Sequence, residues 1–258
     1  MTEANYVNAN YCKSPFQESK PSPEAPSRDP YGLMIATNGP KNNSAENFWK
    51  MVLQNNVTRT IVLTTTIVEE GIAQYFPNEE PGNEEIFFPD FKITQNLAKL
   101  DETSEYSKRF LNVISLKTGI TIHQLEHTHF KGWKDFGLPE ADSLVAYQKM
   151  VKDAAEFIDN SYHNMVAENQ ANPEKLVVHC KAGQGRTGTT LTLINAVLSI
   201  ETQRKEVLAS QGTPTNMRDE IYLSPFSYVR QLREQRAKMC ETEDQYHYLY
   251  HFIYKFLK

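Results

Sequence analysis

The chain has 258 residues, with 27 Lys and Arg against 32 Asp and Glu, so its formal net charge is −5. A protein that binds nucleic acid normally carries a basic surface, so this charge argues against that class and against a nucleic-acid partner. Hydrophobic residues make up 40% of the chain and aromatic residues 11%. That composition can build a sizeable core and excludes a disordered chain.

The start of the sequence, MTEANYVNAN, has no basic region followed by an apolar stretch, so we expect no secretory signal peptide. The longest apolar stretch, 191–200, is shorter than the roughly 18 residues of a membrane span. The cysteines Cys12, Cys180 and Cys240 are too few for a disulfide framework and indicate free thiols in a reducing compartment. We therefore expect a cytoplasmic protein without a transmembrane segment, while delivery to another cell by a route that needs no signal peptide stays open.

The first elements in chain order follow a proline-rich and serine-rich segment, 12–31, which is expected to be an exposed, flexible loop. The apolar run 33–36 begins the core. Ser44 is placed to cap a helix, and 60–65 has the apolar, β-branched composition of a buried strand. Residues 76–101 are acidic and contain several prolines, so they are expected to form a surface excursion.

The second half of the chain begins with a β-hairpin, predicted over 109–116 and 119–130 from alternating apolar and polar residues. Pro139 is expected to open a long helix with apolar residues at three-to-four spacing. A short β-branched strand, 176–179, leads through a glycine-rich loop into a helix that runs through Ile200. Helices are also expected over 224–236 and 242–256. These elements predict one α/β domain over 1–258, a twisted mixed β-sheet flanked by helices.

Residues 179–189, HCKAGQGRTGT, form the segment with the clearest chemistry. Cys180 and Arg186 stand at the two ends of a C-x5-R loop between a strand and a helix. The backbone N–H groups of such a loop, together with the helix N-terminus, can bind a phosphate group. The same positive surroundings would hold Cys180 as a nucleophilic thiolate. The planar guanidinium of Arg186 would bind two phosphoryl oxygens and the charge that develops in the transition state.

Other interpretations of this loop explain less. A buried structural cysteine does not account for the flanking Lys181 and Arg186. The pattern G-x-G-x-x-G from Gly183 to Gly188 follows a strand, as in dinucleotide-binding proteins, but it gives Cys180 no role. A nucleotide phosphate loop needs a lysine where this chain has Thr189. The sequence therefore favours covalent chemistry at a phosphate group.

The segment HCKAGQGRTGT resembles the active-site signature of the protein tyrosine phosphatase family, HC-x-x-G-x-x-R followed by Ser or Thr. The segments NYVNANY, IATNGP, NFWKMV and VRQLREQR resemble other parts of the same family, so the resemblance runs from about Tyr6 to the C-terminus. It implies a tyrosine-phosphatase-like fold and hydrolysis of phosphotyrosine in a protein substrate through a cysteinyl-phosphate on Cys180. It also implies that the phosphoryl group is bound by Lys181, Ala182, Gly183, Gln184, Gly185 and Arg186.

The segment GWKDFGLPE resembles the mobile acid loop of the family, W-P-D. The resemblance makes Asp135 the acid that protonates the leaving phenol and Trp133 a hinge of the loop. Lys134 replaces the usual proline, which removes a backbone restraint and places a positive charge beside Asp135. We expect that charge to weaken Asp135 as an acid.

Gln245 in ETEDQY resembles the second glutamine of the family motif Q-T-x-x-Q, which implies that it positions the hydrolytic water. Thr242 and Gln245 also fit a capping box at the start of the last helix. Glu241 stands where the family has the first glutamine, and we expect its charge to repel phosphate and to slow dephosphorylation.

Three further residues gain roles from the same resemblance. Thr187 is expected to donate a hydrogen bond to the leaving thiolate. His179 is expected to order the loop. Glu69, in VEEGIAQYFP, is expected to be the carboxylate that pairs with Arg186.

The family's K-N-R-Y loop, which clamps the phosphotyrosine ring, is expected to be missing because it would precede Tyr6. An open pocket would admit other substrates, and HCKAG with Lys181 also resembles the signature of phosphoinositide phosphatases. A dual-specificity phosphatase, a phosphoinositide phosphatase and a phosphotyrosine-binding module with weak catalysis therefore stay open as alternatives. We expect no metal and no other cofactor, because the pairs His127/His129 and His247/His251 lack further ligands at metal spacing.

Overall fold

The computed structural model describes residues 6–12, 32–78, 84–96, 101–103, 105–211 and 221–258. The flexible loop predicted over 12–31 lies outside these ranges, except for Cys12, which ends the first strand.

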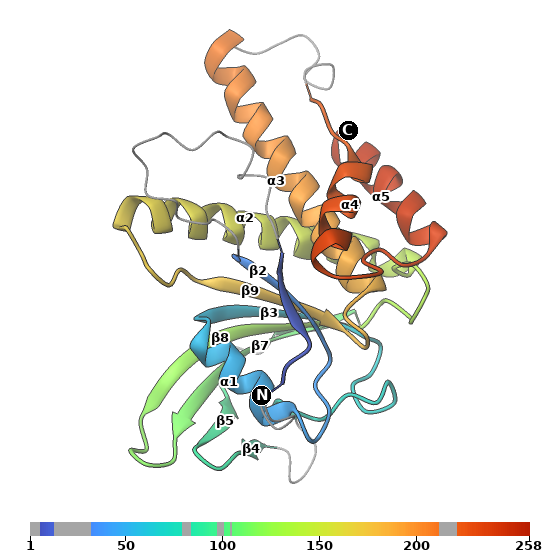
Figure 1. The fold of residues 1–258 in the computed structure, drawn as a ribbon. Helices are drawn as coiled ribbons and strands as arrows, with labels where there is room; N and C mark the ends of the chain where they lie inside the picture. The colour runs from blue at the N-terminus through green and yellow to red at the C-terminus, as the bar shows by residue number, and fades with distance from the viewer. Residues whose placement is uncertain (1–5, 13–31, 79–83, 97–100, 104, 212–220) are drawn as a thin grey trace.

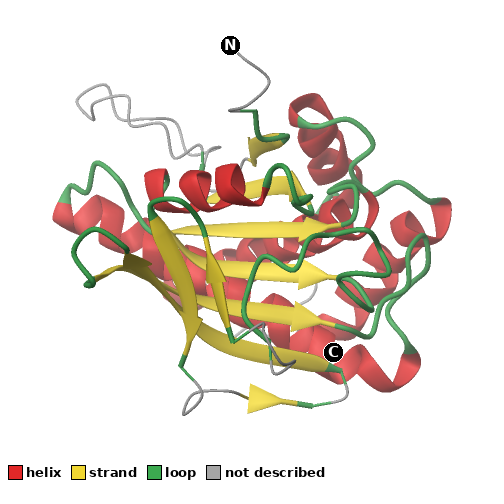
Figure 2. Cartoon of the chain, turned by 90° about the horizontal axis from the view of Figure 1, so that it is seen from below, coloured by secondary structure: helices red, strands yellow, loops and turns green. Residues whose placement is uncertain are grey.

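A twisted mixed β-sheet runs through the centre of the molecule (Figures 1 and 2). Its strands lie in the order β1 (Ala9–Cys12), β2 (Met34–Asn38), β9 (Lys175–Cys180), β3 (Val57–Leu63), β8 (Thr121–Phe130), β7 (Tyr106–Ser115), β5 (Phe91–Gln95) and β4 (Glu85–Phe87), and β6 (Asp101–Glu102) pairs with β7. The central strands β2, β9, β3 and β8 are parallel. Their carboxyl ends therefore meet at one edge of the sheet, where such sheets commonly bind ligands.

Helices cover both faces of this sheet. The helix α1 (Ala45–Gln54) lies on one face, and the other face carries α2 (Leu144–Glu168), α3 (Gly185–Gln211), α4 (Pro225–Gln235) and α5 (Glu243–Phe256) (Figures 1 and 2). Each face has its own apolar core because side chains alternate along a strand: Ile61 and Leu63 of β3 pack toward α2 and α3, whereas Val62 packs toward α1. None of the described helices is both long enough and apolar enough to cross a bilayer.

The α/β class, the hairpin of β7 and β8, and the helices α4 and α5 are confirmed. The surface excursion predicted over 76–101 is wrong in part, because β4 and β5 extend the sheet within it. Pro139 does not open the long helix. It forms a bridge with Trp133, and α2 begins at Leu144 after one turn of 3₁₀ helix. Ser44 precedes α1 but makes no side-chain cap.

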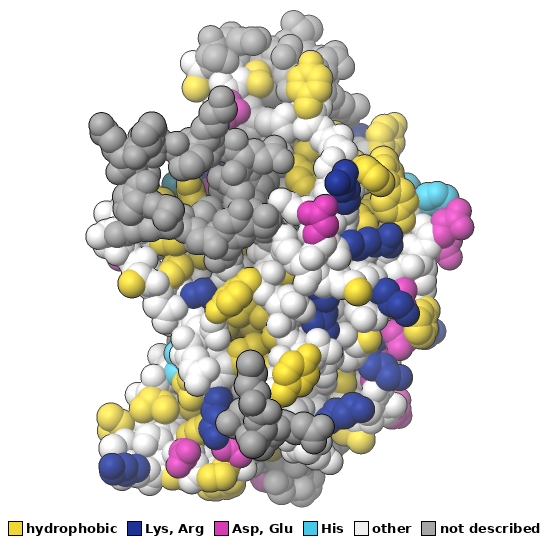
Figure 3. Space-filling model, in the orientation of Figure 1, with side chains coloured by type: hydrophobic (Ala, Val, Ile, Leu, Met, Phe, Trp, Pro, Cys, Tyr) yellow, Lys and Arg dark blue, Asp and Glu magenta, His cyan; other side chains and the backbone are white. Residues whose placement is uncertain are grey.

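The face drawn in Figure 3 mixes Lys and Arg side chains with acidic and hydrophobic ones. The basic side chains do not form a continuous stripe there, in keeping with the net charge.

Candidate active site

The loop between β9 and α3 lies at the carboxyl edge of the parallel strands. All six residues of β9 are buried, and Cys180 is the last of them. Gly183 has a φ of +67°, and a Cβ on it would lie 2.1 Å from the carbonyl oxygen of Thr37, so glycine is required at this position. The N–H of Gly183 donates a hydrogen bond to the Cys180 Sγ at 3.2 Å. The loop thus turns a backbone donor toward the sulfur atom.

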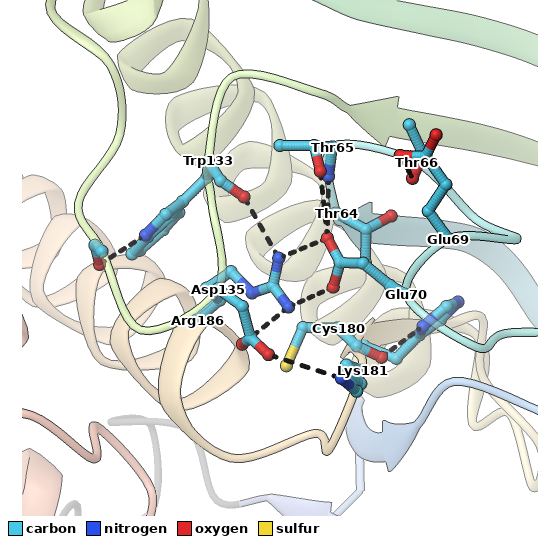
Figure 4. Close-up of polar contacts among 12 residues, drawn as sticks. Thr64, Thr65, Thr66, Glu69, Glu70, Trp133, Asp135, Cys180, Lys181 and Arg186 are labelled. Carbon is cyan, nitrogen blue, oxygen red and sulfur yellow. Dashed lines mark hydrogen bonds and ion pairs between the residues drawn. The ribbon is translucent and has the colours of Figure 1, made fainter.

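Arg186, at the start of α3, is buried and is held by residues of two other segments, the turn after β3 and the loop between β8 and α2 (Figure 4). One terminal nitrogen donates to Glu70 Oε1 (3.0 Å) and to the Trp133 carbonyl oxygen (3.1 Å), and the other donates to Glu70 Oε2 (2.5 Å) and Asp135 Oδ1 (2.9 Å). Burial lowers the pKa of Arg186, but the hydrogen bonds of Glu70 and the negative charges around the guanidinium outweigh it and raise the pKa overall.

The carboxylate that pairs with Arg186 is Glu70, so the prediction of Glu69 for that pairing is wrong. Glu70 also accepts hydrogen bonds from the backbone N–H and the hydroxyl of Thr65, which turn its side chain inward. Glu69 is exposed and bonds to the hydroxyl of Thr66 at 3.0 Å. Burial raises the pKa of Glu70, but the bonds to Arg186 lower it more, and the net shift is downward.

The acid loop between β8 and α2 folds over this arginine. The Trp133 ring is fully buried, and its N–H donates to the carbonyl oxygen of Gly137 at 2.7 Å. Asp135 lies between Arg186 and the amine of Lys181, which is 4.0 Å from Asp135 Oδ2. The side chains of Cys180, Lys181, Arg186 and Asp135 converge at one place (Figure 4).

Lys134 has an ion-pair partner other than Asp135. Its amine pairs with Glu140 at 3.2 Å, and both side chains are exposed. The positive charge that approaches Asp135 comes from Lys181 and Arg186 instead.

His179 lies behind the loop in a chain of buried hydrogen bonds. Its Nδ1 is 3.1 Å from the Cys180 carbonyl oxygen, its Nε2 is 2.7 Å from the Tyr75 hydroxyl, and that hydroxyl is 3.0 Å from His127 Nε2. Burial lowers the pKa of His179 to about 4, so the ring is neutral at pH 7. Because Nδ1–H donates to the carbonyl, Nε2 accepts from Tyr75, which in turn accepts from His127.

The sequence pattern did not single out Tyr75, and His127 entered only as a metal candidate. Arg236 was also missed. It donates to the carbonyl oxygens of Gly183 (2.6 Å) and Ala182 (3.1 Å) and to the side chains of Asn8, just before β1, and Asn10, on β1. The segments that contain Arg236 and the two asparagines resembled the family, but only the fold shows that they meet.

The remaining predicted residues lie around the same loop. The Thr187 hydroxyl is fully buried and has no hydrogen-bond partner among the described residues, and the same holds for Arg186 Nε. Gln245 and Thr242 form the predicted capping box of α5. Glu241 pairs with Lys238 at 3.6 Å, so its charge has a partner and does not stand alone beside the loop. Gln184 accepts backbone hydrogen bonds from Gly188 and Cys240 through its carbonyl oxygen.

The described residues contain no group of three His, Cys, Asp or Glu side chains arranged to hold a metal ion. His127 is bound to Tyr75, and the positive field of the site comes from Arg186 and from backbone N–H groups.

Fold and site together define an α/β domain with a cysteine-containing anion loop, a buried arginine and a carboxylate held above them. The family model for the protein-tyrosine phosphatase matches residues 1–255. The chain therefore belongs to the protein-tyrosine phosphatase family.

Individual proteins agree with that assignment. The chain is 30% identical over 261 residues to tyrosine-protein phosphatase non-receptor type 9 of Homo sapiens, covering 99% of this chain and 37% of that protein. It is 29% identical over 259 residues to receptor-type tyrosine-protein phosphatase eta of Homo sapiens, covering 95% of this chain and 15% of that protein. The chain thus spans well under half the length of these relatives.

Among solved structures, the fold is similar to one described as the structural basis of the PTPN18 fingerprint on distinct HER2 tyrosine phosphorylation sites. The TM-score is 0.67 at 24% sequence identity, with 98% of this chain and 73% of that chain covered. This similarity concerns the fold.

Proposed function

We propose that the protein hydrolyses phosphotyrosine in protein substrates through a cysteinyl-phosphate intermediate. The observation that carries the proposal is the pair of buried, unpartnered donors at the cysteine loop, Arg186 Nε and the Thr187 hydroxyl. Buried polar groups without a partner are uncommon in folded proteins and call for an explanation, such as a ligand that supplies the missing bond. A phosphoryl group bound on the loop would supply oxygen acceptors for such donors.

In the first step, the Cys180 thiolate attacks phosphorus and the bond between phosphorus and the phenolic oxygen breaks. The electron pair of that bond goes to the phenolic oxygen, and the protonated form of Asp135 donates its proton there. Before this step, phosphoryl oxygens of the bound substrate replace the Asp135 carboxylate, which lies 2.9 Å from Arg186 in the free protein, and so free Asp135 to act as the acid. Glu70 keeps the guanidinium in place during this exchange, because it accepts hydrogen bonds from both terminal nitrogens of Arg186.

In the second step, a water molecule attacks phosphorus and gives its proton to the Asp135 carboxylate. The sulfur–phosphorus bond breaks, and Cys180 leaves as a thiolate. The N–H of Gly183 already lies 3.2 Å from the sulfur and stabilises that charge. Thr187 is expected to add a second hydrogen bond. Inorganic phosphate is the product.

The phosphoinositide alternative rests on Lys181, whose side chain is 54% exposed. The approach of its amine to Asp135 favours a role at the rim of the tyrosine-phosphatase site instead. A phosphotyrosine-binding module would not need a general acid. In this protein the candidate acid, Asp135, lies next to Arg186, which supports an enzyme. The three cysteines of the described residues are free thiols, which supports action in the cytoplasm.

The proposal is tested by phosphate release from a phosphotyrosyl peptide in excess EDTA, beside a phosphoseryl peptide and a phosphoinositide. We expect turnover that prefers phosphotyrosine, survives EDTA and vanishes in Cys180→Ser. Binding of the phosphotyrosyl peptide without turnover would contradict the enzyme proposal, and preferred turnover of the phosphoinositide would contradict the substrate class.

A further inference from the structure

Gln245 is buried at the N-terminus of α5 and contacts two separate parts of the site. Its Oε1 accepts the backbone N–H groups of Glu241 (3.0 Å) and Thr242 (3.3 Å), and its Nε2 donates to the carbonyl oxygen of Gly137 (3.4 Å). Gly137 belongs to the acid loop. One side chain therefore joins that loop to the turn between α4 and α5.

The contacts fix the orientation of the Gln245 amide. Two N–H donors face its oxygen, and one carbonyl oxygen faces its nitrogen, so the reversed amide would oppose like groups at every contact. Both lone pairs of Oε1 are used in the turn. The amide also packs on the cysteine loop, because a Cβ on Gly185 would lie 2.9 Å from Oε1. The oxygen has no lone pair left to accept a hydrogen bond from a reacting water molecule.

The acid loop has a second attachment at Arg186, which binds the Trp133 carbonyl oxygen and the Asp135 carboxylate. A phosphoryl group on Arg186 competes with Asp135 for the guanidinium. The hydrogen bond between Gln245 and Gly137 involves neither the guanidinium nor the Asp135 carboxylate, so displacement of Asp135 does not require it to break.

We propose that Gln245 is a positioning residue for the general acid: it holds Gly137, and with it the acid loop, over the bound phosphoryl group. This role rests on the proposed phosphatase function and replaces the water-positioning role that the resemblance implied for Gln245. It assigns Gln245 to formation of the cysteinyl-phosphate, the step that needs a proton on the leaving phenol.

The test is Gln245→Glu, measured with phenyl phosphate and p-nitrophenyl phosphate. Glutamate has the shape of glutamine and can still accept the two N–H groups of the turn, but it cannot donate to Gly137. Phenol is a poor leaving group that needs the acid, and p-nitrophenol is a good one. We expect kcat/KM to fall about tenfold for phenyl phosphate, the size of one lost hydrogen bond. For p-nitrophenyl phosphate we expect a fall several-fold smaller, because the negative charge of the glutamate repels both esters alike and only the need for the acid separates them.

The control is Thr242→Ala, which removes the hydrogen bond from the Gln245 backbone N–H to the Thr242 hydroxyl but leaves the amide contact to Gly137. We expect this variant to lose stability while the ratio of kcat/KM for the two substrates stays as in wild type. The same ratio separates acid positioning from a general loss of folded protein.

Two results would overturn the role of Gln245. One is an equal fall of kcat/KM for both substrates. The other is an unchanged kcat/KM with a burst of p-nitrophenol and slow steady-state turnover, because kcat/KM reports the steps up to the cysteinyl-phosphate and a burst reports slow hydrolysis of it. A wild-type protein that hydrolyses neither substrate would contradict the proposed function itself.

Discussion

The pairing of Glu70 with Arg186 can be tested by Glu70→Ala, with Glu69→Ala as the matched control. The two glutamates are neighbours in the chain, but only Glu70 contacts the buried guanidinium, through both carboxylate oxygens. The side chain of Glu70 is 11% exposed and that of Arg186 is 1% exposed. Removing Glu70 therefore leaves a buried cation with fewer partners.

The size of the effect follows from that burial. Breaking a buried ion pair by removing one partner costs about 3–5 kcal/mol, and Asp135 at 2.9 Å from Arg186 offsets part of the loss, so we expect about 3 kcal/mol. For a chain of this size, that loss lowers Tm by roughly 6–12 °C. Because Arg186 also loses its orientation, we expect kcat/KM for a phosphotyrosyl peptide to fall by at least about tenfold.

Thermal unfolding and peptide turnover of the two variants show which glutamate pairs with Arg186. Glu69→Ala is expected to unfold within about 2 °C of wild type, because an exposed hydrogen bond contributes little. The pairing would be refuted if Glu69→Ala lost as much stability and activity as Glu70→Ala, or if Glu70→Ala matched wild type.

Three further predictions concern stability and the acid loop. Burial lowers the pKa of His129 to about 4, so the unfolded chain binds the proton first as pH falls from about 6.5 to 4. Urea unfolding should show an acid loss of stability that His129→Gln reduces by about 3 kcal/mol, and an equal loss in this variant and in wild type would contradict the role of His129. Gly183→Ala should abolish turnover and lower Tm, because the new Cβ would clash with the Thr37 backbone. In Gly71→Ala the new Cβ meets nothing within 4 Å, so this variant should lose only the stability that a positive φ costs an alanine. Equal losses in the two variants would contradict the steric argument. Asp135→Asn should lower kcat/KM for phenyl phosphate far more than for p-nitrophenyl phosphate, and an equal fall for both would remove Asp135 as the acid.

The cysteine loop could be predicted from sequence because its residues lie within one short segment. Cys180, Gly183 and Arg186 are at most six positions apart, and the strand before them and the helix after them fix their geometry. Asp135 could be predicted for the same reason, since Trp133 and Gly137 mark its loop locally.

The partner of Arg186 could not be predicted in the same way. Two adjacent glutamates follow β3, and the choice between them depends on the turn at Thr65, which directs Glu70 inward. The hydrogen bonds from His127 to Tyr75 and from Tyr75 to His179 join residues more than fifty positions apart in sequence. No local pattern records such contacts.

The errors in the fold have similar causes. Prolines and acidic residues between β3 and β7 marked the segment as a loop, but Phe91 and Ile93 of β5 are buried against the sheet, and burial outweighs the local signal. Pro139 was expected to begin a helix, yet its bridge to Trp133 belongs to the acid loop and delays the helix to Leu144.

In the proposed mechanism, Cys180 carries the phosphoryl group during turnover. The most direct measurement is an acid quench of the protein mixed with a phosphotyrosyl peptide, followed by peptide mapping of the protein by mass spectrometry. Phosphate on Cys180 at early times, and its absence in Cys180→Ser, is the predicted result. Turnover of the peptide with no phosphate ever found on Cys180, or with equal turnover in Cys180→Ser, would contradict the mechanism.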